Sequence, residues 1–332
     1  MPPAPIVRSA PMAPQAPMVR SVLCAAILWL AVPGPARADD FFAVRDQNPL
    51  LRGSYLPLPT DSRAAAPGTF SAMLLVSNTL NVESRGDEKL LVDGESTVLD
   101  LSYEDGFASR WRYRVSLPVI HDGGGALDTV IDDWHRLFGF SRGYRPYYPK
   151  SQIDYFYSGA EHGVARAQTG LGDLAVDAGW YAIDDARHTL SVWGGLKAPT
   201  GNRSDLMSDG AWDGAAWANA AMGVARWRLA AELGLLQPFG DEIFAGRAHR
   251  TAAFARLAAG REFGARWTLR AQIDAESNRV ADTDLRFIGR SLQLTVGADA
   301  RLRGRWRVQM GFSEDAAVNT APDITFFLGI HD

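Results

Sequence analysis

Apolar and polar residues alternate strictly along many short segments of this chain. In SRWRYRVSL, which begins at Ser109, large apolar residues occupy every second position, and arginine or serine fills the positions between them. The segments ARWRLAAEL, ARWTLRAQI and GRWRVQMGF follow a similar pattern. A period of two predicts β-strands with one apolar face and one polar face.

About twelve such segments follow one another along the chain. They are 70–82, 96–104, 109–119, 171–183, 189–198, 212–224, 227–237, 251–261, 265–276, 289–301, 305–313 and 322–330. Short links alternate with long ones, which include 83–95 and, as the longest, 120–170. An even number of strands of about ten residues, with short turns at one end and long loops at the other, is typical of outer-membrane barrels. The sequence therefore predicts an all-β fold, a closed antiparallel up-and-down transmembrane β-barrel of about 12 strands over residues 69–332, with 120–170 as an extracellular insertion.

The charged residues fall on one face of these predicted strands. A cation on the lipid side of a barrel at the bilayer midplane costs about 2–4 kcal/mol, so we expect the charged face to line the lumen. A soluble β protein with a dry apolar centre would show the same alternation, which alone does not separate the two. The predicted lumen-facing charged ladder comprises Asp100, Glu104, Arg110, Arg112, Arg114, Asp173, Asp177, Lys197, Arg266, Arg270, Asp274 and Glu276. We further expect the acidic residues of 100–104 to face the arginines of 110–114 across a hairpin.

Aromatic residues mark the ends of the predicted strands next to the short turns. Tryptophan prefers the membrane–water interface, where its ring contacts acyl chains and its N–H reaches the headgroups. We therefore expect a periplasmic aromatic girdle, formed by Tyr103, Trp111, Trp180, Trp227, Trp267 and Trp306.

The N-terminal region carries the pattern of an export signal. Arg20 precedes an apolar run, and Ala36-Arg37-Ala38 provides a cleavage site, so residues 1–38 are interpreted as a signal peptide, with Met18 as an alternative start. Residues 39–68, rich in proline and glycine, are predicted to form an irregular periplasmic arm. The signal, with the barrel pattern, indicates the outer membrane of a Gram-negative bacterium.

The long insertion contains one helical pattern. DTVIDDWHRLFGF, from Asp128 to Phe140, places apolar residues at helical spacing and predicts a short amphipathic helix. We expect this region to form a lid or constriction at the barrel mouth, with packing on the rim as the alternative. The constriction candidates are Trp134, His135, Phe138, Arg142 and Arg145.

Composition limits the kinds of molecule that the protein is expected to bind. The net charge is −4, which argues against nucleic acid. The histidines, at 121, 135, 162, 188, 249 and 331, are scattered, and no metal-ligand spacing or phosphate loop appears, so we predict no enzyme activity, no cofactor and no metal site. Expected partners are outer-membrane lipid and lipopolysaccharide, the barrel-assembly machinery, periplasmic chaperones and small solutes.

Two motifs carry a family resemblance. TGLGDLAVDAGWYAI at Thr169–Ile183, followed by LKAPTG at Leu196–Gly201, resembles a motif pair of outer-membrane barrels that include transporter families and barrels of phenol-degradation pathways. With DWHRLFGFSRGYRP and DITFFLGI, nearly all of residues 40–332 resembles an uncharacterised bacterial family of predicted outer-membrane proteins, known as a domain of unknown function. The chain departs from many such barrels because it ends on Ile330-His331-Asp332 rather than on an aromatic residue.

From the residues we expect Asp173 and Asp177 to point into the lumen beside Lys197, as ion pairs of the wall. The resemblance supports fold and location and implies no established activity. We therefore expect a passive pore or channel for small solutes. The alternatives are a non-conducting structural or assembly-related barrel, plugged by its own side chains and the insertion, and a lipid enzyme active at the rim.

Overall fold

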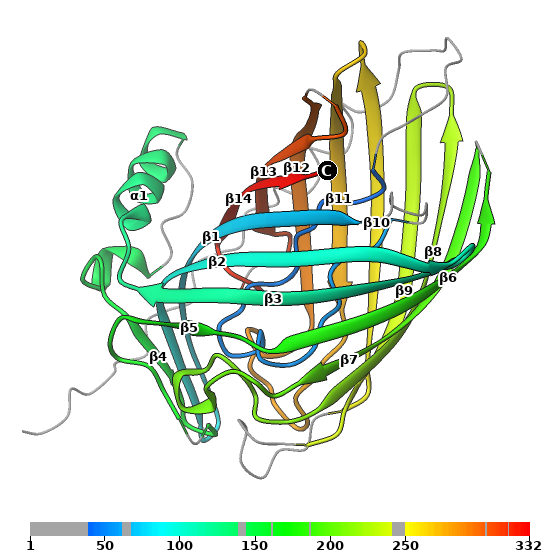
Figure 1. Ribbon diagram of the computed structural model, residues 1–332. Helices are drawn as coiled ribbons and strands as arrows, with labels where there is room; N and C mark the ends of the chain where they lie inside the picture. Colours follow the sequence, from blue (N-terminus) through cyan, green and yellow to red (C-terminus); the bar gives the residue numbers. More distant parts are fainter. Residues whose placement is uncertain are drawn as a thin grey trace, which may run out of the picture. The chain divides into compact units, whose positions relative to one another are not determined.

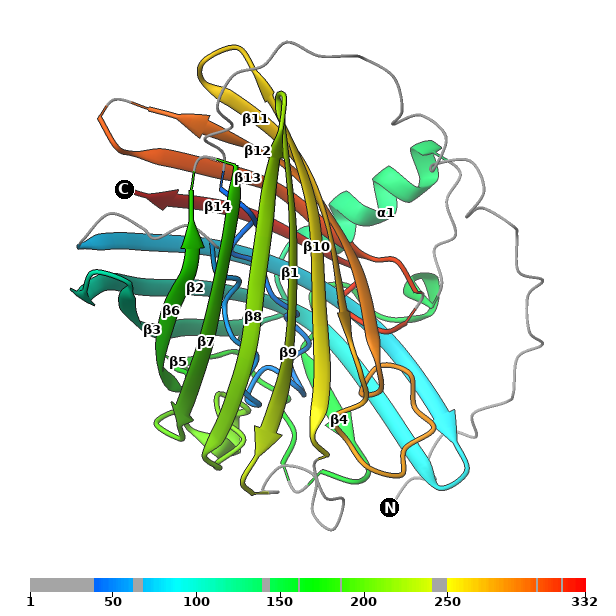
Figure 2. The same cartoon turned by 90° about the vertical axis from the view of Figure 1, so that its right-hand side faces the viewer.

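The structure is a computed structural model that describes residues 39–61, 68–138, 144–160, 162–185, 187–240, 250–302, 304–317 and 319–332. Within these residues, one antiparallel sheet of fourteen strands contains a closed barrel of twelve (Figures 1 and 2). The barrel strands are β1 (Thr69–Arg85), β2 (Glu88–Ala108), β3 (Trp111–Gly123), β6 (Leu174–Asp184), β7 (His188–Ala198), β8 (Asp213–Val224), β9 (Trp227–Pro238), β10 (Ala252–Phe263), β11 (Trp267–Glu276), β12 (Ser291–Arg301), β13 (Arg307–Asp315) and β14 (Ile324–His331).

The barrel closes where its last strand pairs with its first. Ser71 of β1 lies opposite His331 of β14, and the register continues to Asn78 opposite Ile324. Elsewhere each strand pairs with its neighbours in the chain, and β3 pairs with β6 across the insertion. The predicted closed up-and-down barrel is confirmed, and each of the twelve predicted segments overlaps one barrel strand.

Two predicted loops contain additional strand structure. The connection 83–95 is not a loop, because β1 and β2 continue to a turn at Gly86 and Asp87, and Leu90 and Val92 are buried there. In the insertion, β4 (Asp154–Tyr157) pairs with β2, and β5 (Gln168–Leu171) pairs with β3. Alternation over so few residues is too short a signal to identify these strands from sequence.

The apolar face of the barrel points outward. Leu233 and Leu257 are 65% and 56% exposed, whereas Glu232 and Arg256, one position earlier in their strands, are 0% and 2% exposed. A protein with a dry apolar centre would show the reverse. The predicted orientation, with an apolar outer wall and a charged inner wall, is confirmed, and it is the arrangement of a membrane barrel.

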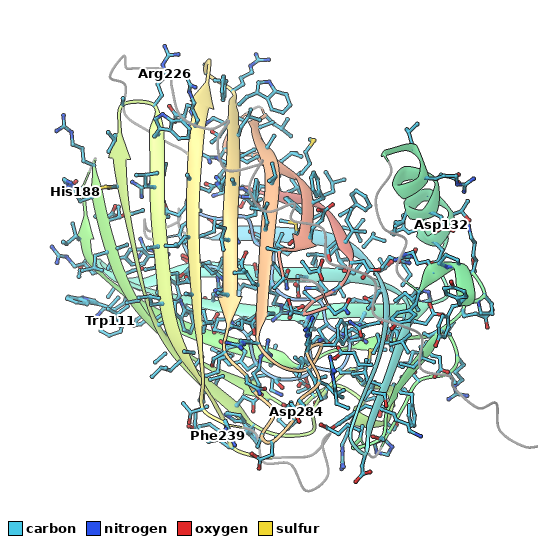
Figure 3. All side chains as sticks on the ribbon, turned by 180° about the vertical axis from the view of Figure 1, so that it is seen from behind. Trp111, Asp132, His188, Arg226, Phe239 and Asp284 are labelled. Carbon is cyan, nitrogen blue, oxygen red and sulfur yellow. The ribbon has the colours of Figure 1, made fainter. Side chains whose placement is uncertain are left out.

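The barrel has a short-turn end and a long-loop end. Figure 3 shows His188 and Arg226 at the short-turn end and Phe239 and Asp284 toward the opposite, long-loop end. Helix α1 (Leu127–Phe138) belongs to the insertion, together with the 3-10 turn η1 (Arg145–Tyr147); a second 3-10 turn, η2 (Arg203–Asp205), lies between β7 and β8. Among the described residues, no helix is long and apolar enough to cross a membrane.

The segment Asp39–Asp61 lies inside the barrel, and we call it the plug. It is irregular, as predicted, but it is not an arm outside the barrel: Phe42, Val44, Leu50 and Leu56 are all buried. Figures 1 and 2 show this blue segment winding within the ring of strands. The sequence pattern of proline, glycine and polar residues indicates irregular backbone but does not say which side of a wall it occupies. Residues 1–38 and 62–67, which include the predicted signal peptide, lie outside the described residues.

Loops cover the long-loop end with an apolar cluster. Leu50 and Leu51 of the plug pack there with Tyr155 of β4, Leu90 of β2 and Phe287 of the β11–β12 loop. Part of the insertion therefore packs against the plug in this cluster, and its role as a lid stays a prediction.

Candidate functional site

The plug runs along the lumen and back. Its two ends meet near the short-turn end, where the Asp40 N–H donates to Asp61 Oδ1 at 2.7 Å. Between them, Asn48 lies at the long-loop end and donates its side-chain amide to the Phe287 carbonyl. The lumen is thus filled by a looped segment whose ends lie together.

At the turn of the plug, one arginine pairs with the wall. The Arg52 guanidinium contacts the Asp122 carboxylate of β3 with both terminal nitrogens, and Arg52 Nη1 also donates to Ser96 Oγ at 3.0 Å. Both charged side chains are at most 5% exposed. A charge enclosed this fully needs its partner, so this pair fixes the position of the turn.

The two family motifs meet at the returning half of the plug. Lys197, from LKAPTG, lies 2.9 Å from Asp173 of GLGDL and 3.1 Å from Asp213 of β8, and it also pairs with Asp209. Its ammonium donates to the Gly53 carbonyl of the plug at 2.7 Å. The predicted approach of Lys197 to Asp173 is therefore present, and the motif pair binds plug backbone as well as pairing within the wall.

Tyr55 occupies the next position along this contact. Its N–H donates to Asp213 Oδ2 at 2.8 Å and its hydroxyl donates to Asp177 Oδ1. Gly195 of β7 faces the same space, where an added Cβ would collide with the Tyr55 hydroxyl. The absence of a side chain at Gly195 makes room for the plug.

Several further contacts share one chemistry, in which arginines outside the plug donate to carbonyls of the plug. Arg256 donates to the Pro57 carbonyl at 2.8 Å, and Arg114 donates to the carbonyls of Leu58 and Pro59 at 2.8 and 3.1 Å. The same chemistry joins Arg270 to Asp39 and Arg279 to Leu51. Several of these arginines also pair with carboxylates. The plug is therefore held by side-chain hydrogen bonds to its backbone, and none of its residues joins a strand.

Burial changes the acidity of two plug carboxyl groups. The pKa of Asp46 is raised to about 7, first by burial and then by the nearby Glu276 carboxylate, with Arg279 acting in the opposite direction. The pKa of Asp61 is raised to about 8 by burial and by the carboxylates of Asp39 and Asp40. Both groups therefore favour their neutral forms while the plug is in place.

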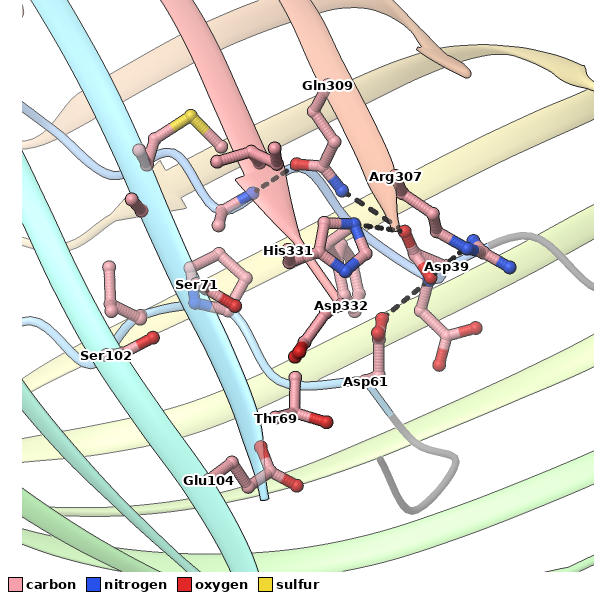
Figure 4. A pocket seen from close by; sticks show the side chains of 18 of the residues that line it. Asp39, Asp61, Thr69, Ser71, Ser102, Glu104, Arg307, Gln309, His331 and Asp332 are labelled. Carbon is pink, nitrogen blue, oxygen red and sulfur yellow. Dashed lines mark hydrogen bonds and ion pairs between the residues drawn. The ribbon is translucent and has the colours of Figure 1, made fainter. Parts of the chain in front are cut away.

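A pocket of about 450 Å³ opens next to the ends of the plug (Figure 4). Asp39 and Asp61 of the plug line it, together with Arg307 of β13 and His331 of β14. Burial raises the pKa of the Asp39 carboxyl, but His331 and Arg307 outweigh burial and hold it well below the usual range. It is much larger than the pocket of about 30 Å³ beside Lys197 and Arg52.

Most residues of the predicted lumen ladder lie on the inner wall. Those buried there are Asp100, Arg114, Asp173, Asp177, Lys197, Arg270 and Glu276, and Asp274, Glu104 and Arg112 are half-buried. Arg110 and Arg266 are exposed in the short turns and do not belong to the ladder. Each directly precedes the first residue of a strand, so the predicted strands 109–119 and 265–276 begin too early.

The predicted pairing of 100–104 with 110–114 is largely wrong. Only Glu104 and Arg114 are opposite each other, because Asp100 faces Pro118 and a register shift lies between Gly106 and Ala108. Asp100 instead binds Arg45 of the plug at 2.9 Å, and Arg114 binds Asp177 of β6 at 2.7 Å. Asp100 therefore pairs with the plug, and Arg114 pairs with a strand on its other side.

The predicted girdle residues all lie near the short-turn end. Tyr103, Trp111, Trp180, Trp267 and Trp306 are 39–48% exposed, and Trp227 is half-buried. Trp111 and Trp180 are directly opposite each other on β3 and β6. Their contact with a membrane interface remains a prediction.

The constriction candidates are described only in part. Arg142 and the side chains of Trp134, His135 and Phe138 lie outside the described residues. Arg145 is buried, but it binds Asp128 of α1 and Asp323 before β14, and so it joins the insertion to the rim. The predicted helix is present as α1, with Leu137 76% exposed. The described lumen is filled by the plug rather than by this helix.

The sequence reasoning missed the plug and the aromatic residues that receive it. Trp193 and Trp217, which point inward and stack with ring centroids 6.1 Å apart, pack in one cluster with Leu56. Inward tryptophans on a charged face were a possible signal, since a water-filled lumen gives them no reason to be there.

Comparison with known proteins places the chain in a family. A solved outer membrane channel of the COG4313 group from Pseudomonas putida F1 is similar, with a TM-score of 0.56, 16% identity, and coverage of 82% of this chain and 98% of that chain. The β domain of the Bordetella autotransporter BrkA (TM-score 0.44, 14% identity, 80% and 99% coverage) and the Ralstonia pickettii toluene transporter TbuX (0.40, 10%, 81% and 90%) are more distant. No curated protein matches the chain. The family model described as "Protein of unknown function (DUF3187)" matches residues 19–331, and the chain therefore belongs to this family.

Proposed function

We propose that this protein is a channel for small polar solutes in the outer membrane of a Gram-negative bacterium, and that the plug closes it at rest. The observation that carries the proposal is the chemistry of the lumen, whose wall is charged although the plug fills it. Buried charges are costly unless they are paired, and a purely structural barrel could fill its centre with apolar residues instead. A charged wall is useful when the lumen is at times open to water and solute.

The solute class follows from the wall. The cations that now donate to plug carbonyls would be released when the plug moves, together with carboxylates such as Asp100 and Asp177. Solutes with hydroxyl, carboxylate or amino groups could replace the plug contacts, whereas a hydrocarbon would leave the wall groups without the hydrogen bonds that the plug now supplies. The exposed apolar outer wall supports insertion among lipid and lipopolysaccharide, and we expect barrel-assembly machinery and periplasmic chaperones to handle the chain before insertion.

The alternative is a non-conducting barrel. The apolar cluster that closes the long-loop end and the buried Arg52–Asp122 pair favour it, because both hold the plug firmly. No catalytic role is proposed in either case.

Swelling of proteoliposomes in solutions of small sugars and amino acids distinguishes these functions. We expect slow swelling with the wild-type protein and fast swelling with a variant lacking residues 42–58. A second variant, Gly195→Ala, weakens the plug without a deletion, and Gly194→Ala is its control. If the deletion variant folds as a barrel and admits no solute, the channel proposal fails and the structural barrel stands.

A further inference from the structure

Three side chains from distant parts of the sequence converge beside the pocket at the short-turn end. They are Asp39 at the start of the plug, Asp299 of β12 and His331 of β14, and one donor atom from each lies within 4.8 Å of the others. His331 Nε2 is 3.1 Å from Asp39 Oδ2 and 4.0 Å from Asp299 Oδ2. Figure 4 shows His331 and Asp39 turned toward each other.

Arg307 lies next to both carboxylates and donates a hydrogen bond to Asp39. Its Nη1 lies 2.7 Å from Asp39 Oδ1 and 3.7 Å from Asp299 Oδ1, which leaves the Oδ2 atom of each carboxylate on the side of His331. Gln309 donates to Asp39 Oδ2 at 3.3 Å. Hydrogen bonds and charges that hold ligating carboxylates in place in this way are a regular feature of metal sites.

One of these oxygens lacks a partner. The Asp299 side chain is 2% exposed, and its Oδ2 accepts no hydrogen bond, although it is directed at the imidazole. A buried carboxylate oxygen without a donor is costly, so this oxygen is available as a ligand for a cation in addition to Arg307.

We propose that Asp39, Asp299 and His331 bind a divalent transition-metal ion, with Zn²⁺ as the best-fitting probe. Imidazole and carboxylate ligands suit Zn²⁺, whereas Mg²⁺ and Ca²⁺ prefer oxygen ligands alone. Ligands around a tetrahedral Zn²⁺ are roughly 3.3–3.5 Å apart, which the 3.1 Å between Asp39 and His331 nearly matches. Asp299, at 4.0 Å from His331, has to approach it by more than about half an ångström. Three protein ligands leave a position for water, and the pocket lined by Asp39 and His331 gives the ion a way in.

Such an ion would fasten the first residue of the plug to two barrel strands. The effect of the ion on the channel rests on the proposed closure by the plug. Binding of the ion does not depend on that proposal. The absence of a metal-ligand spacing in the sequence is no obstacle, because the three ligands lie far apart in the chain and only the closed barrel brings them together.

Calorimetric titration of the untagged, chelator-treated protein with Zn²⁺ tests the site. We expect one saturable site, loss of binding in His331→Gln and at least tenfold weaker binding in Asp299→Asn, which is nearly isosteric and preserves the barrel. His188→Gln, which changes an exposed histidine at the same end, should bind like the wild type. The proposal is overturned if the wild type binds no Zn²⁺ saturably, or if Asp299→Asn and His331→Gln bind as tightly as the His188→Gln control. Zinc binding by a protein that never conducts would uphold the site and reject the channel, and conduction without zinc binding would do the opposite.

Discussion

Gly195 of β7 and Tyr55 of the plug share one space, because the Tyr55 hydroxyl lies where a side chain at Gly195 would begin. The Tyr55 hydroxyl donates to Asp177 within this space, so the plug fits only because Gly195 has no side chain. A single added methyl group at Gly195 therefore tests whether the plug occupies this position.

Gly195→Ala should loosen the plug. The added methyl group overpacks the site at a cost of about 1–3 kcal/mol, which corresponds to a roughly 5- to 150-fold increase in plug release. Trypsin cleavage after Arg45 or Arg52 measures the release, because both arginines are enclosed while the plug is in place. Gly194→Ala is the matched control, since its Cβ would meet only an ordinary contact at 3.8 Å. Adding Tyr55→Phe to Gly195→Ala should restore part of the protection, and equal cleavage of the two alanine variants would refute this account.

Breaking the Arg52–Asp122 pair should destabilise the barrel strongly. Removing one partner of a buried pair leaves an unpaired charge and costs about 3–5 kcal/mol, so Asp122→Asn should lower the free energy of unfolding by that order. Urea denaturation in detergent measures it. Arg136→Ala breaks an exposed pair with Asp133, both over 60% exposed, and should cost at most about 1 kcal/mol. Similar losses in the two variants would contradict the enclosed position of the plug turn.

Plug release should increase as the pH rises through about 7 to 8. The pKa values of Asp46 and Asp61 are raised to about 7 and about 8 in the seated plug, whereas a released plug would return them toward 3.8. The seated state therefore binds more protons between about pH 4 and pH 8, and its stability falls as pH increases over that range. The charged neighbours are Glu276 and Arg279 for Asp46, and Asp39, Asp40 and Arg270 for Asp61.

Tryptic cleavage of the plug, compared at pH 6 and pH 8.5 after correction for the enzyme's own pH dependence, measures this effect. Asp46→Asn stays neutral at both values and should reduce the difference. A wild-type plug that is released more readily at the acidic value would mean that carboxylate pairing, and not burial, dominates these two groups.

The sequence was sufficient to predict the barrel strands but not the plug that fills the lumen. Alternation identifies strands and their faces because a barrel strand has a period of two and a membrane excludes charge from its outer side, as Leu233 and Glu232 illustrate. The approach of Lys197 to Asp173 could be predicted because Asp173 directly precedes β6 and Lys197 lies near the end of β7, its partner in one hairpin.

The plug could not be predicted in the same way. Its contacts join residues that lie far apart in the chain, such as Thr60 and Glu232, and no local periodicity records them. For the same reason the ladder was assigned the wrong partners: Asp100 binds Arg45, a residue of the segment expected outside the barrel.

Single-channel recording in planar bilayers tests the central claim most directly, with the wild-type protein and the variant lacking residues 42–58 inserted under the same conditions. The account predicts a closed trace at moderate voltage for the wild type and stable, stepwise currents for the deletion variant. Equal currents through both proteins would show that the plug does not close the lumen, and would contradict the account.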